Sequence, residues 1–169
     1  MTRPDPTEYA PYFGKYVSLV EGDDIIAALS DQLDDTLGLL HNLSEPQGDL
    51  RYAPGKWSIK EVIGHLIDSE RIFAYRALRF ARNDQRPLPG FDENSYVANS
   101  NYGARRLADL AEEFEIVRKG NLYFFRHLGG ADWDRRGKAN DNEISVRALA
   151  YNIAGHELHH LGIIRERYL

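Results

Sequence analysis

The sequence predicts an all-α protein, one domain over residues 1–169 built as a four-helix bundle. Four stretches carry apolar residues at the three- and four-residue spacing of an amphipathic helix, and the segments between them hold most of the glycine, proline and asparagine. No stretch shows a good strand pattern. A chain of 169 residues fits one domain better than two, because domains of about 100 to 150 residues are the commonest size.

The first predicted helix spans residues 24–43. Asp24 at its start suits the positive end of the helix dipole. Its apolar stripe consists of Ile26, Leu29, Leu33, Leu37 and Leu40. Residues 1–20 precede this helix, and their aromatic side chains are Tyr9, Tyr12, Phe13 and Tyr16. That segment is too aromatic for a free tail, so we expect it to pack against the bundle.

The second predicted helix spans residues 58–82 and has the clearest start in the chain. Ser58 and Glu61 form a Ser-x-x-Glu capping box, in which the two residues satisfy each other's free backbone N–H groups. The apolar stripe of this helix consists of Ile59, Val62, Ile63, Leu66, Phe73, Ala77 and Phe80. His65 falls beside that stripe.

The third predicted helix spans residues 104–128, and the fourth begins near Ser145 and continues almost to the C-terminus. The inward face of the third carries Leu107, Leu110, Phe114, Val117 and Phe124 or Phe125. One face of the fourth carries Leu149, Ile153, His156, His160 and Ile164. Two histidines therefore share a face with core residues.

Two connections, residues 83–103 and 129–144, are longer than the usual 2 to 8 or so residues between bundle helices. Both are predicted as loops. Long loops are commonly lids, binding loops or crossovers, so we expect the first to roof a pocket. Tyr96, Tyr102 and Asp92 are its candidates for contacts with a substrate, although each is equally explained by packing within the loop.

The composition excludes several classes of protein. The chain has no cysteine, which excludes disulfides, thiolate metal ligands and a cysteine nucleophile. Its net charge of −5 and interleaved charges argue against nucleic-acid binding, which normally needs a basic face. The start lacks the apolar core of a signal peptide, and no run of about 18 apolar residues predicts a membrane span. We therefore expect a cytoplasmic protein.

His156 and His160 are the strongest signal of chemistry. Residues at i and i+4 on a helix place their side chains about 5 to 6 Å apart on one face, so two imidazoles can meet one ion. Neutral imidazole suits Zn, Ni, Cu and Fe. A catalytic site usually needs a third protein ligand and leaves positions open.

His65 is the candidate for that third ligand, since it lies beside the core stripe of another helix. His41 and His127 fall near helix ends, where a ring faces water or complements the dipole. His159 lies about 100° around the helix from His160 and is expected to be exposed or to support the site from outside it. Spacing alone leaves open that the histidines are separate, hydrogen-bonded core residues.

Residues 156–160 also match His-Glu-x-x-His, the zincin metalloprotease pattern. Zincins take a third ligand downstream, but only nine residues follow His160, and Ile163 stands where the extended pattern needs glycine. No strand is predicted to hold an extended peptide. We therefore expect Glu157 to be solvated or to support the site from outside it, and keep the protease as a minor alternative.

The chain from about residue 20 onward resembles the DinB-like superfamily, also called DinB/YfiT-like metalloenzymes. The resemblance rests on Trp57-Ser58-x-x-Glu61-x-x-x-His65-Leu66 and on His156-x-x-x-His160-x-Gly162, in that order within one helical domain. It implies a four-helix bundle of DinB/YfiT type and a metal site formed by His65, His156 and His160. One departure is Ile163-Ile164, where many relatives have Gln-Ile.

The resemblance also implies functions. Relatives include S-transferases and isomerases that use low-molecular-weight thiols, and dimers are common. We therefore expect one divalent transition metal (Zn, Ni, Fe or Mn), a small-molecule substrate, a homodimer, and transferase or hydrolase activity with or without a thiol cosubstrate. The alternatives are a non-catalytic stress-response or metal-storage module with a structural ion, and a dimeric scaffold without metal.

No residue stands out as a general base. Asp68 and Glu70 lie three and five residues after His65, and either could face the site or be a solvated helix charge. Asn152 lies one turn before His156 on the same face, so it is the better candidate for orienting a metal-bound ring.

Overall fold

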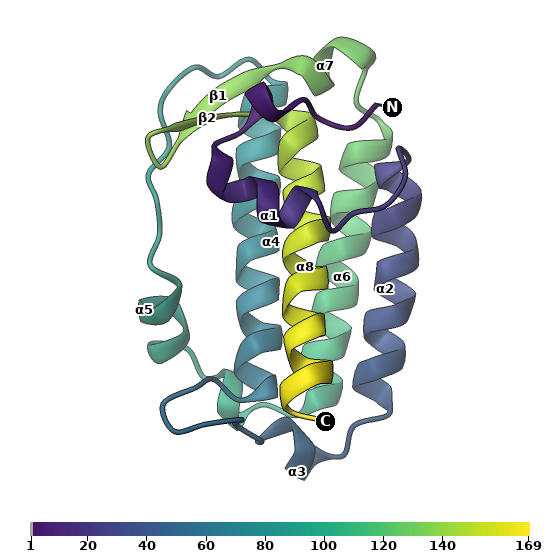
Figure 1. Ribbon diagram of the computed structural model, residues 1–169, viewed down its shortest axis with the longest axis vertical. Helices are drawn as coiled ribbons and strands as arrows, with labels where there is room; N and C mark the ends of the chain where they lie inside the picture. Colours follow the sequence, from purple (N-terminus) through teal and green to yellow (C-terminus); the bar gives the residue numbers. More distant parts are fainter. Residues whose placement is uncertain (1) are drawn as a thin grey trace.

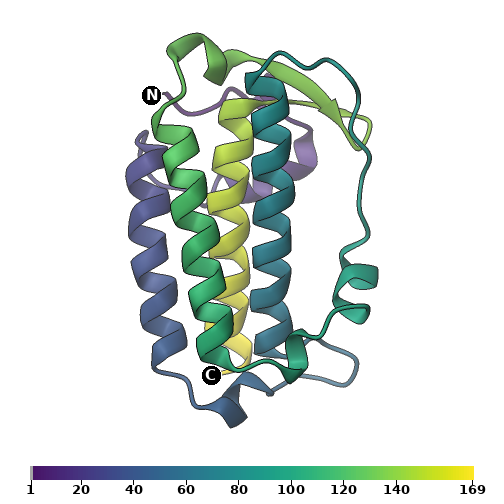
Figure 2. The same ribbon diagram turned by 180° about the vertical axis from the view of Figure 1, so that it is seen from behind.

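The computed structural model describes residues 2–169, and four long helices dominate it (Figure 1). They are α2 (Ile25–His41), α4 (Ile59–Ala81), α6 (Leu107–Arg126) and α8 (Val146–Arg167). The helices α2 and α8 run in one direction and α4 and α6 in the other, as both side views show (Figures 1 and 2). The predicted all-α four-helix bundle is confirmed, with each helix within a few residues of its predicted bounds.

Side-chain caps fix where these helices begin. The Asp24 carboxylate accepts hydrogen bonds from the backbone N–H groups of Ile26 and Ala27. At α4, Glu61 accepts from the Ser58 N–H at 2.7 Å and donates its own N–H to Ser58 Oγ at 3.3 Å, which confirms the predicted capping box.

Short helices lie in the connections and at the N-terminus. The α-helices are α1 (Gly14–Val17), α3 (Glu45–Gly48), α5 (Glu93–Ala98) and α7 (Gly130–Asp134). Three 3₁₀ turns are η1 (Pro6–Glu8), η2 (Pro11–Phe13) and η3 (Tyr102–Ala104). The connection from α4 to α6 passes through α5 and η3 along the whole bundle, because these two parallel helices begin at the same end (Figure 1).

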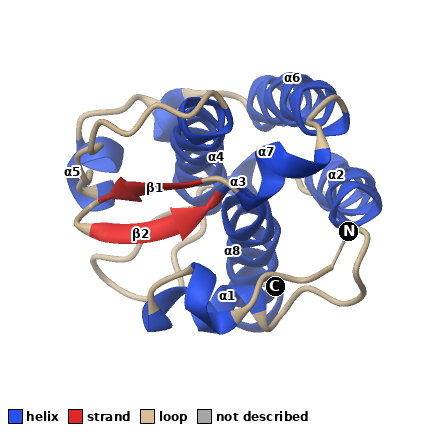
Figure 3. Cartoon of the chain, turned by 90° about the horizontal axis from the view of Figure 1, so that it is seen from above, coloured by secondary structure: helices blue, strands red, loops and turns tan. Residues whose placement is uncertain are grey.

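The prediction that residues 129–144 form a loop without a strand is wrong. They contain α7 and most of an antiparallel hairpin of β1 (Arg136–Ala139) and β2 (Asn142–Ser145), which lies near one end of α4 and α8 (Figure 3). Strands of four residues are too short to show an alternating pattern. Asn140 and Asp141, with φ of 48° and 61°, make the two-residue turn that fits the twist of a hairpin.

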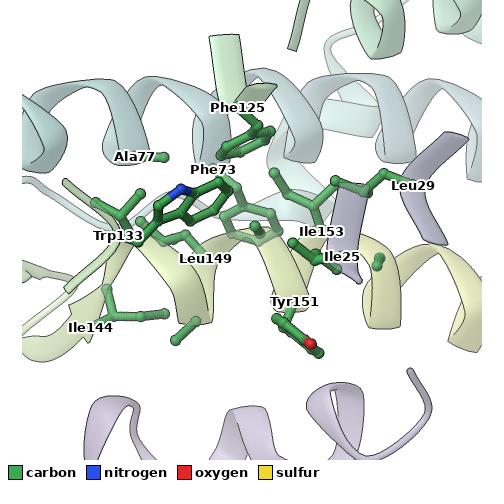
Figure 4. Packing of buried hydrophobic residues seen from close by; sticks show 14 of the residues in the cluster. Ile25, Leu29, Phe73, Ala77, Phe125, Trp133, Ile144, Leu149, Tyr151 and Ile153 are labelled. Carbon is green, nitrogen blue, oxygen red and sulfur yellow. The ribbon is translucent and has the colours of Figure 1, made fainter. Parts of the chain in front are cut away.

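The apolar core consists of two clusters. One packs α2, α4, α6 and α8 against α7 and the hairpin, and includes Ile25, Phe73, Phe125, Trp133 and Leu149 (Figure 4). The other fills the half of the bundle near α3. Between the two clusters the buried side chains of α4, α6 and α8 are polar, namely Ser69, Glu70, Arg118, His156 and Glu157. No described helix is long and apolar enough to cross a membrane.

Candidate metal centre

The structure brings His65, His156 and His160 together. His156 Nε2 lies 3.1 Å from His65 Nε2 and 3.2 Å from His160 Nε2, and one ring nitrogen of each residue lies within 4.8 Å of the other two. The antiparallel arrangement of α4 and α8 explains the meeting, because His65 follows the start of α4, while His156 lies at the middle of α8 and His160 one turn further on. We call these residues the three-histidine cluster.

Its geometry and charge fit a divalent transition metal. Two nitrogens bound to one ion at 2.0 to 2.1 Å, with angles of about 90° to 110°, lie roughly 2.9 to 3.4 Å apart, which spans both observed separations. Burial lowers the pKa of His65 to about 4 and that of His160 to about 3. Burial and the neighbouring histidines also hold the pKa of His156 well below its usual value. At neutral pH the three rings are therefore uncharged, the form that binds metals.

Packing around the rings fixes their orientation. Trp57 packs on His65 with 4.9 Å between ring centroids, and Tyr16 packs edge-on against His156 at 5.3 Å. Ser69 Oγ lies 3.5 Å from Nδ1 of His65. Tyr16 comes this close because Gly155 has no side chain: a Cβ there would lie 2.0 Å from the Tyr16 carbonyl oxygen.

The cluster opens onto a cavity of about 500 Å³, which we call the central cavity. Its walls come from the N-terminal segment, α4, α8, the hairpin and the connection that follows α4. Six aromatic side chains line it, namely Tyr12, Phe13, Tyr16, Trp57, Phe73 and Phe91. Arg76, Glu93 and His159 are its charged or titratable side chains besides the three histidines.

The three loop candidates predicted from the sequence lie outside the cavity lining. Tyr96 is half exposed, and Asp92 caps α5 by accepting from the N–H groups of Asn94 and Ser95. Tyr102 donates its hydroxyl to Asp68 Oδ1 at 2.7 Å. The loop nevertheless lines the cavity, through other residues: Gly90, Phe91 and Glu93.

Two glutamates bind an arginine instead of facing the cavity. Arg118 donates to Glu70 Oε1 at 2.7 Å and Oε2 at 2.8 Å, and to Glu157 Oε2 at 2.7 Å. Thr36 Oγ1 donates to Glu157 Oε1 at 2.5 Å. We call Arg118, Glu70, Glu157 and Thr36 the Arg118 network. Glu157 is 1% exposed, so a solvated position is wrong for it, and a carboxylate bound in this way is not placed as the base of a zincin.

The other polar candidates take separate positions. Asn152 is fully buried, and neither Nδ2 nor Oδ1 of its side chain has a hydrogen-bond partner among the described residues. No hydrogen bond therefore supports its predicted role in orienting the His156 ring. His159 is half buried, lines the cavity and packs on Tyr16 at 5.4 Å. His41 ends α2 exposed, and the Nδ1 atom of His127 lies 2.7 Å from the Tyr123 carbonyl oxygen.

Arg76 and the aromatic walls of the cavity are functional features that the sequence did not predict. A signal for Arg76 existed: it follows His65 by 11 residues, which is just over three helical turns, so both lie on one face of α4. The walls from residues 9–16 and from the hairpin are long-range contacts, and helical periodicity contains no information on them.

Comparison with known proteins places the chain in a family. Residues 28–164 match the family model described as the DinB superfamily. The chain belongs to this superfamily. Two proteins of Oceanobacillus iheyensis, both named putative metal-dependent hydrolase, are 29% and 24% identical to it over 83% of the chain and cover 84% and 79% of their own lengths.

A solved structure shares the fold. It is YfiT from Bacillus subtilis, described as a probable metal-dependent hydrolase with an unusual four-helix bundle topology. The TM-score is 0.70 at 16% identity, over 97% of this chain and 90% of YfiT. The match confirms the DinB/YfiT-type bundle, in which α4 and α6 run parallel and are joined by a long crossover.

Proposed function

We propose that this member of the DinB superfamily is a metal-dependent hydrolase of a small organic substrate, with the ion held by His65, His156 and His160. The observation that carries the proposal is the convergence of three neutral imidazoles, two of them buried and that of His160 half-buried, on one wall of the central cavity. A divalent transition metal bound there would supply Lewis acidity and a nucleophile at neutral pH. The candidate ions are Zn, Ni, Fe and Mn, and imidazole ligands suit the first three best.

The arrangement suits catalysis better than a structural ion or a storage site. Structural sites are usually closed by four protein ligands, whereas catalytic sites have three and keep a position open. Among the described residues the cluster contains three ligands, and the cavity adjoins all of them. The aromatic walls would limit the water that reaches a bound substrate, and the packing of Trp57 and Tyr16 holds two of the rings in place.

A thiol-dependent S-transferase is the second candidate. The observation that favours it is the size of the central cavity, since about 500 Å³ leaves room for a small thiol beside a small electrophile. Such an enzyme would have no turnover without thiol, whereas a hydrolase would not need it.

We also propose a homodimer, which light scattering during gel filtration would test.

The test is an activity screen of the purified chain loaded in turn with each of the four metals. Carboxylic esters, lactones and amides are offered alone, and small electrophiles are offered with and without several low-molecular-weight thiols. We expect metal-dependent turnover that falls at least about 100-fold in His160→Ala. His127→Ala is the matched control, because the His127 ring is exposed and lies directly after the C-terminal end of α6. Equal rates in the wild type and His160→Ala would contradict the proposal.

A further inference from the structure

Arg76 is a buried cation with no ion-pair partner in the part of the chain that the structure describes. The residue is 6% exposed and lines the central cavity, yet no carboxylate among the described residues lies within 4.0 Å of its guanidinium. Burial lowers the pKa of Arg76, as expected for a charge that lacks a partner. A buried charge is expensive unless it is paired, so this arrangement needs an explanation.

The guanidinium still has free hydrogen-bonding capacity. Its Nη2 donates to the Pro89 carbonyl oxygen at 2.9 Å, which uses one of the five N–H groups of an arginine. No other acceptor for these groups is found among the described residues, and none of the guanidinium nitrogens is sealed from solvent without a partner. The remaining donors are therefore available to a molecule in the cavity.

The position of Arg76 relates it to the three-histidine cluster. Arg76 and His65 lie on the same face of α4, and side chains on a helix lean toward its N-terminus, which here is the direction of His65. Phe73 lies between the two sites: its ring centroid is 5.9 Å from the Arg76 guanidinium carbon and 5.8 Å from the ring centroid of His156. Phe91 covers the guanidinium from the loop, also at 5.9 Å.

We propose that Arg76 binds a carboxylate group of the substrate, and that the enzyme therefore acts on small carboxylate-bearing molecules. The proposal rests on the proposed function in taking the central cavity as the substrate site. A planar guanidinium with free N–H groups matches a carboxylate, with two parallel hydrogen bonds. One substrate carboxylate would balance the single charge of Arg76, whereas a dianionic phosphate would leave excess negative charge in a cavity that Glu93 also lines.

Binding of benzoate and benzamide to the full chain, freed of metal by a chelator, tests the proposal. The two probes have nearly the same shape and differ in charge. Burial lowers the pKa of His159 as well as those of the three clustered histidines, so all four rings are neutral at pH 7.5, and a preference for benzoate reports another cation in the cavity. Ligand-observed NMR titration should show benzoate bound at least about tenfold more tightly than benzamide. Equal affinities in the wild type would overturn the proposal without any variant.

Variants locate the cation. Arg76→Gln should abolish the preference for benzoate. Arg76→Lys keeps the positive charge, so it should retain part of this preference even if the hydrogen bond to the Pro89 carbonyl oxygen is lost. Arg71→Gln is the matched control, because Arg71 lies on the same helix outside the cavity and pairs with Glu113. Lys15→Gln controls for the exposed cation over the rings of Tyr12 and Tyr16.

Three outcomes would overturn the assignment: a preference that survives in Arg76→Gln, one that disappears in Lys15→Gln, or phenyl phosphate bound more tightly than benzoate. The titration needs no metal, so it remains readable if the metal proposal fails. Repeating it after zinc loading reports on the metal separately.

Discussion

Two groups of buried polar side chains lie next to each other in the bundle and are built in opposite ways. In the Arg118 network, one guanidinium meets two carboxylates and the Leu29 carbonyl oxygen, and Thr36 completes the second carboxylate. In the three-histidine cluster, three neutral nitrogens face one another and open onto a cavity. Glu157 and His156 are neighbours in sequence, yet they belong to different groups.

The difference separates structure from function. Charges that find all their partners inside the protein hold helices together, and removing one partner is costly. Donors and acceptors that converge without partners are a cost to the fold unless something else binds them. The same contrast distinguishes two buried arginines, since among the described residues Arg118 pairs with two carboxylates and Arg76 with none.

Breaking the Arg118 network should have the largest effect on folding. Arg118→Met leaves the carboxylates of Glu70 and Glu157 buried beside each other, so we expect the free energy of unfolding to fall by about 3 to 5 kcal/mol. Urea unfolding followed by circular dichroism measures it. Adding Glu70→Gln and Glu157→Gln should recover part of the loss, and Arg126→Met, at an exposed position of α6, should change little. A loss below about 1 kcal/mol in Arg118→Met would contradict a structural role.

Breaking the three-histidine cluster should affect metal binding instead. His160→Ala removes one of three ligands, and we expect zinc affinity, measured by competition with a chromogenic chelator, to fall at least about 100-fold. The unfolding free energy of the metal-free protein should change by only about 1 kcal/mol or less, because the ring is half-buried and its contact with His156 Nε2 at 3.2 Å amounts to one ordinary hydrogen bond. A large loss of unfolding free energy in His160→Ala with unchanged zinc affinity would contradict this account, because the histidine would then serve the fold and not the metal.

A substitution at Gly155 tests the close packing of α8 against the N-terminal segment beside the three-histidine cluster. In Gly155→Ala the new methyl group would clash with the Tyr16 backbone, so we expect a loss of about 1 to 3 kcal/mol. Gly162→Ala is the matched control on the same helix, where a Cβ meets nothing within 4 Å, and should stabilise α8 by up to about 1 kcal/mol. Thermal unfolding of both variants measures these changes in stability. Equal changes in melting temperature would mean that α1 moves to accommodate the methyl group, which would contradict the expected clash.

Glu8 offers a smaller version of the Arg118 network. It accepts from Ser145 Oγ at 2.7 Å and from Arg147 at 2.8 Å, and these hydrogen bonds lower the pKa of the buried carboxyl against the opposing effect of burial. A lowered carboxyl pKa adds stability above the ordinary value of about 4.5, and this stability is lost as the pH falls through the lowered value.

Glu8→Gln should therefore cost about 1 to 2 kcal/mol at pH 7 and progressively less below pH 4.5 or so. Urea unfolding of the variant and the wild type across this range measures the difference. A difference that grows as the pH falls would contradict the assigned ion pair.

The sequence predicted the features that depend on local spacing. Helix bounds and the pair His156 and His160 follow from a period of 3.6 residues. It could not predict the groups that depend on how helices face each other. Whether Glu70 faces the histidines or Arg118 is decided by the parallel arrangement of α4 and α6, which no local pattern encodes.

The hairpin escaped prediction because four-residue strands are shorter than the pattern that would reveal them. The loop candidates failed for a related reason. Tyr96, Tyr102 and Asp92 are polar side chains of a long loop, but which residues of that loop line the cavity, such as Phe91, depends on its path along the bundle.

The central claim is that the three histidines hold one catalytic ion. Anomalous diffraction at the zinc edge, from crystals of the zinc-loaded chain, tests it most directly. We expect one peak per chain, about 2.0 to 2.2 Å from a ring nitrogen of each of His65, His156 and His160, with its remaining ligands being solvent in the central cavity. An ion bound elsewhere, or one closed off by a fourth protein ligand, would contradict the account.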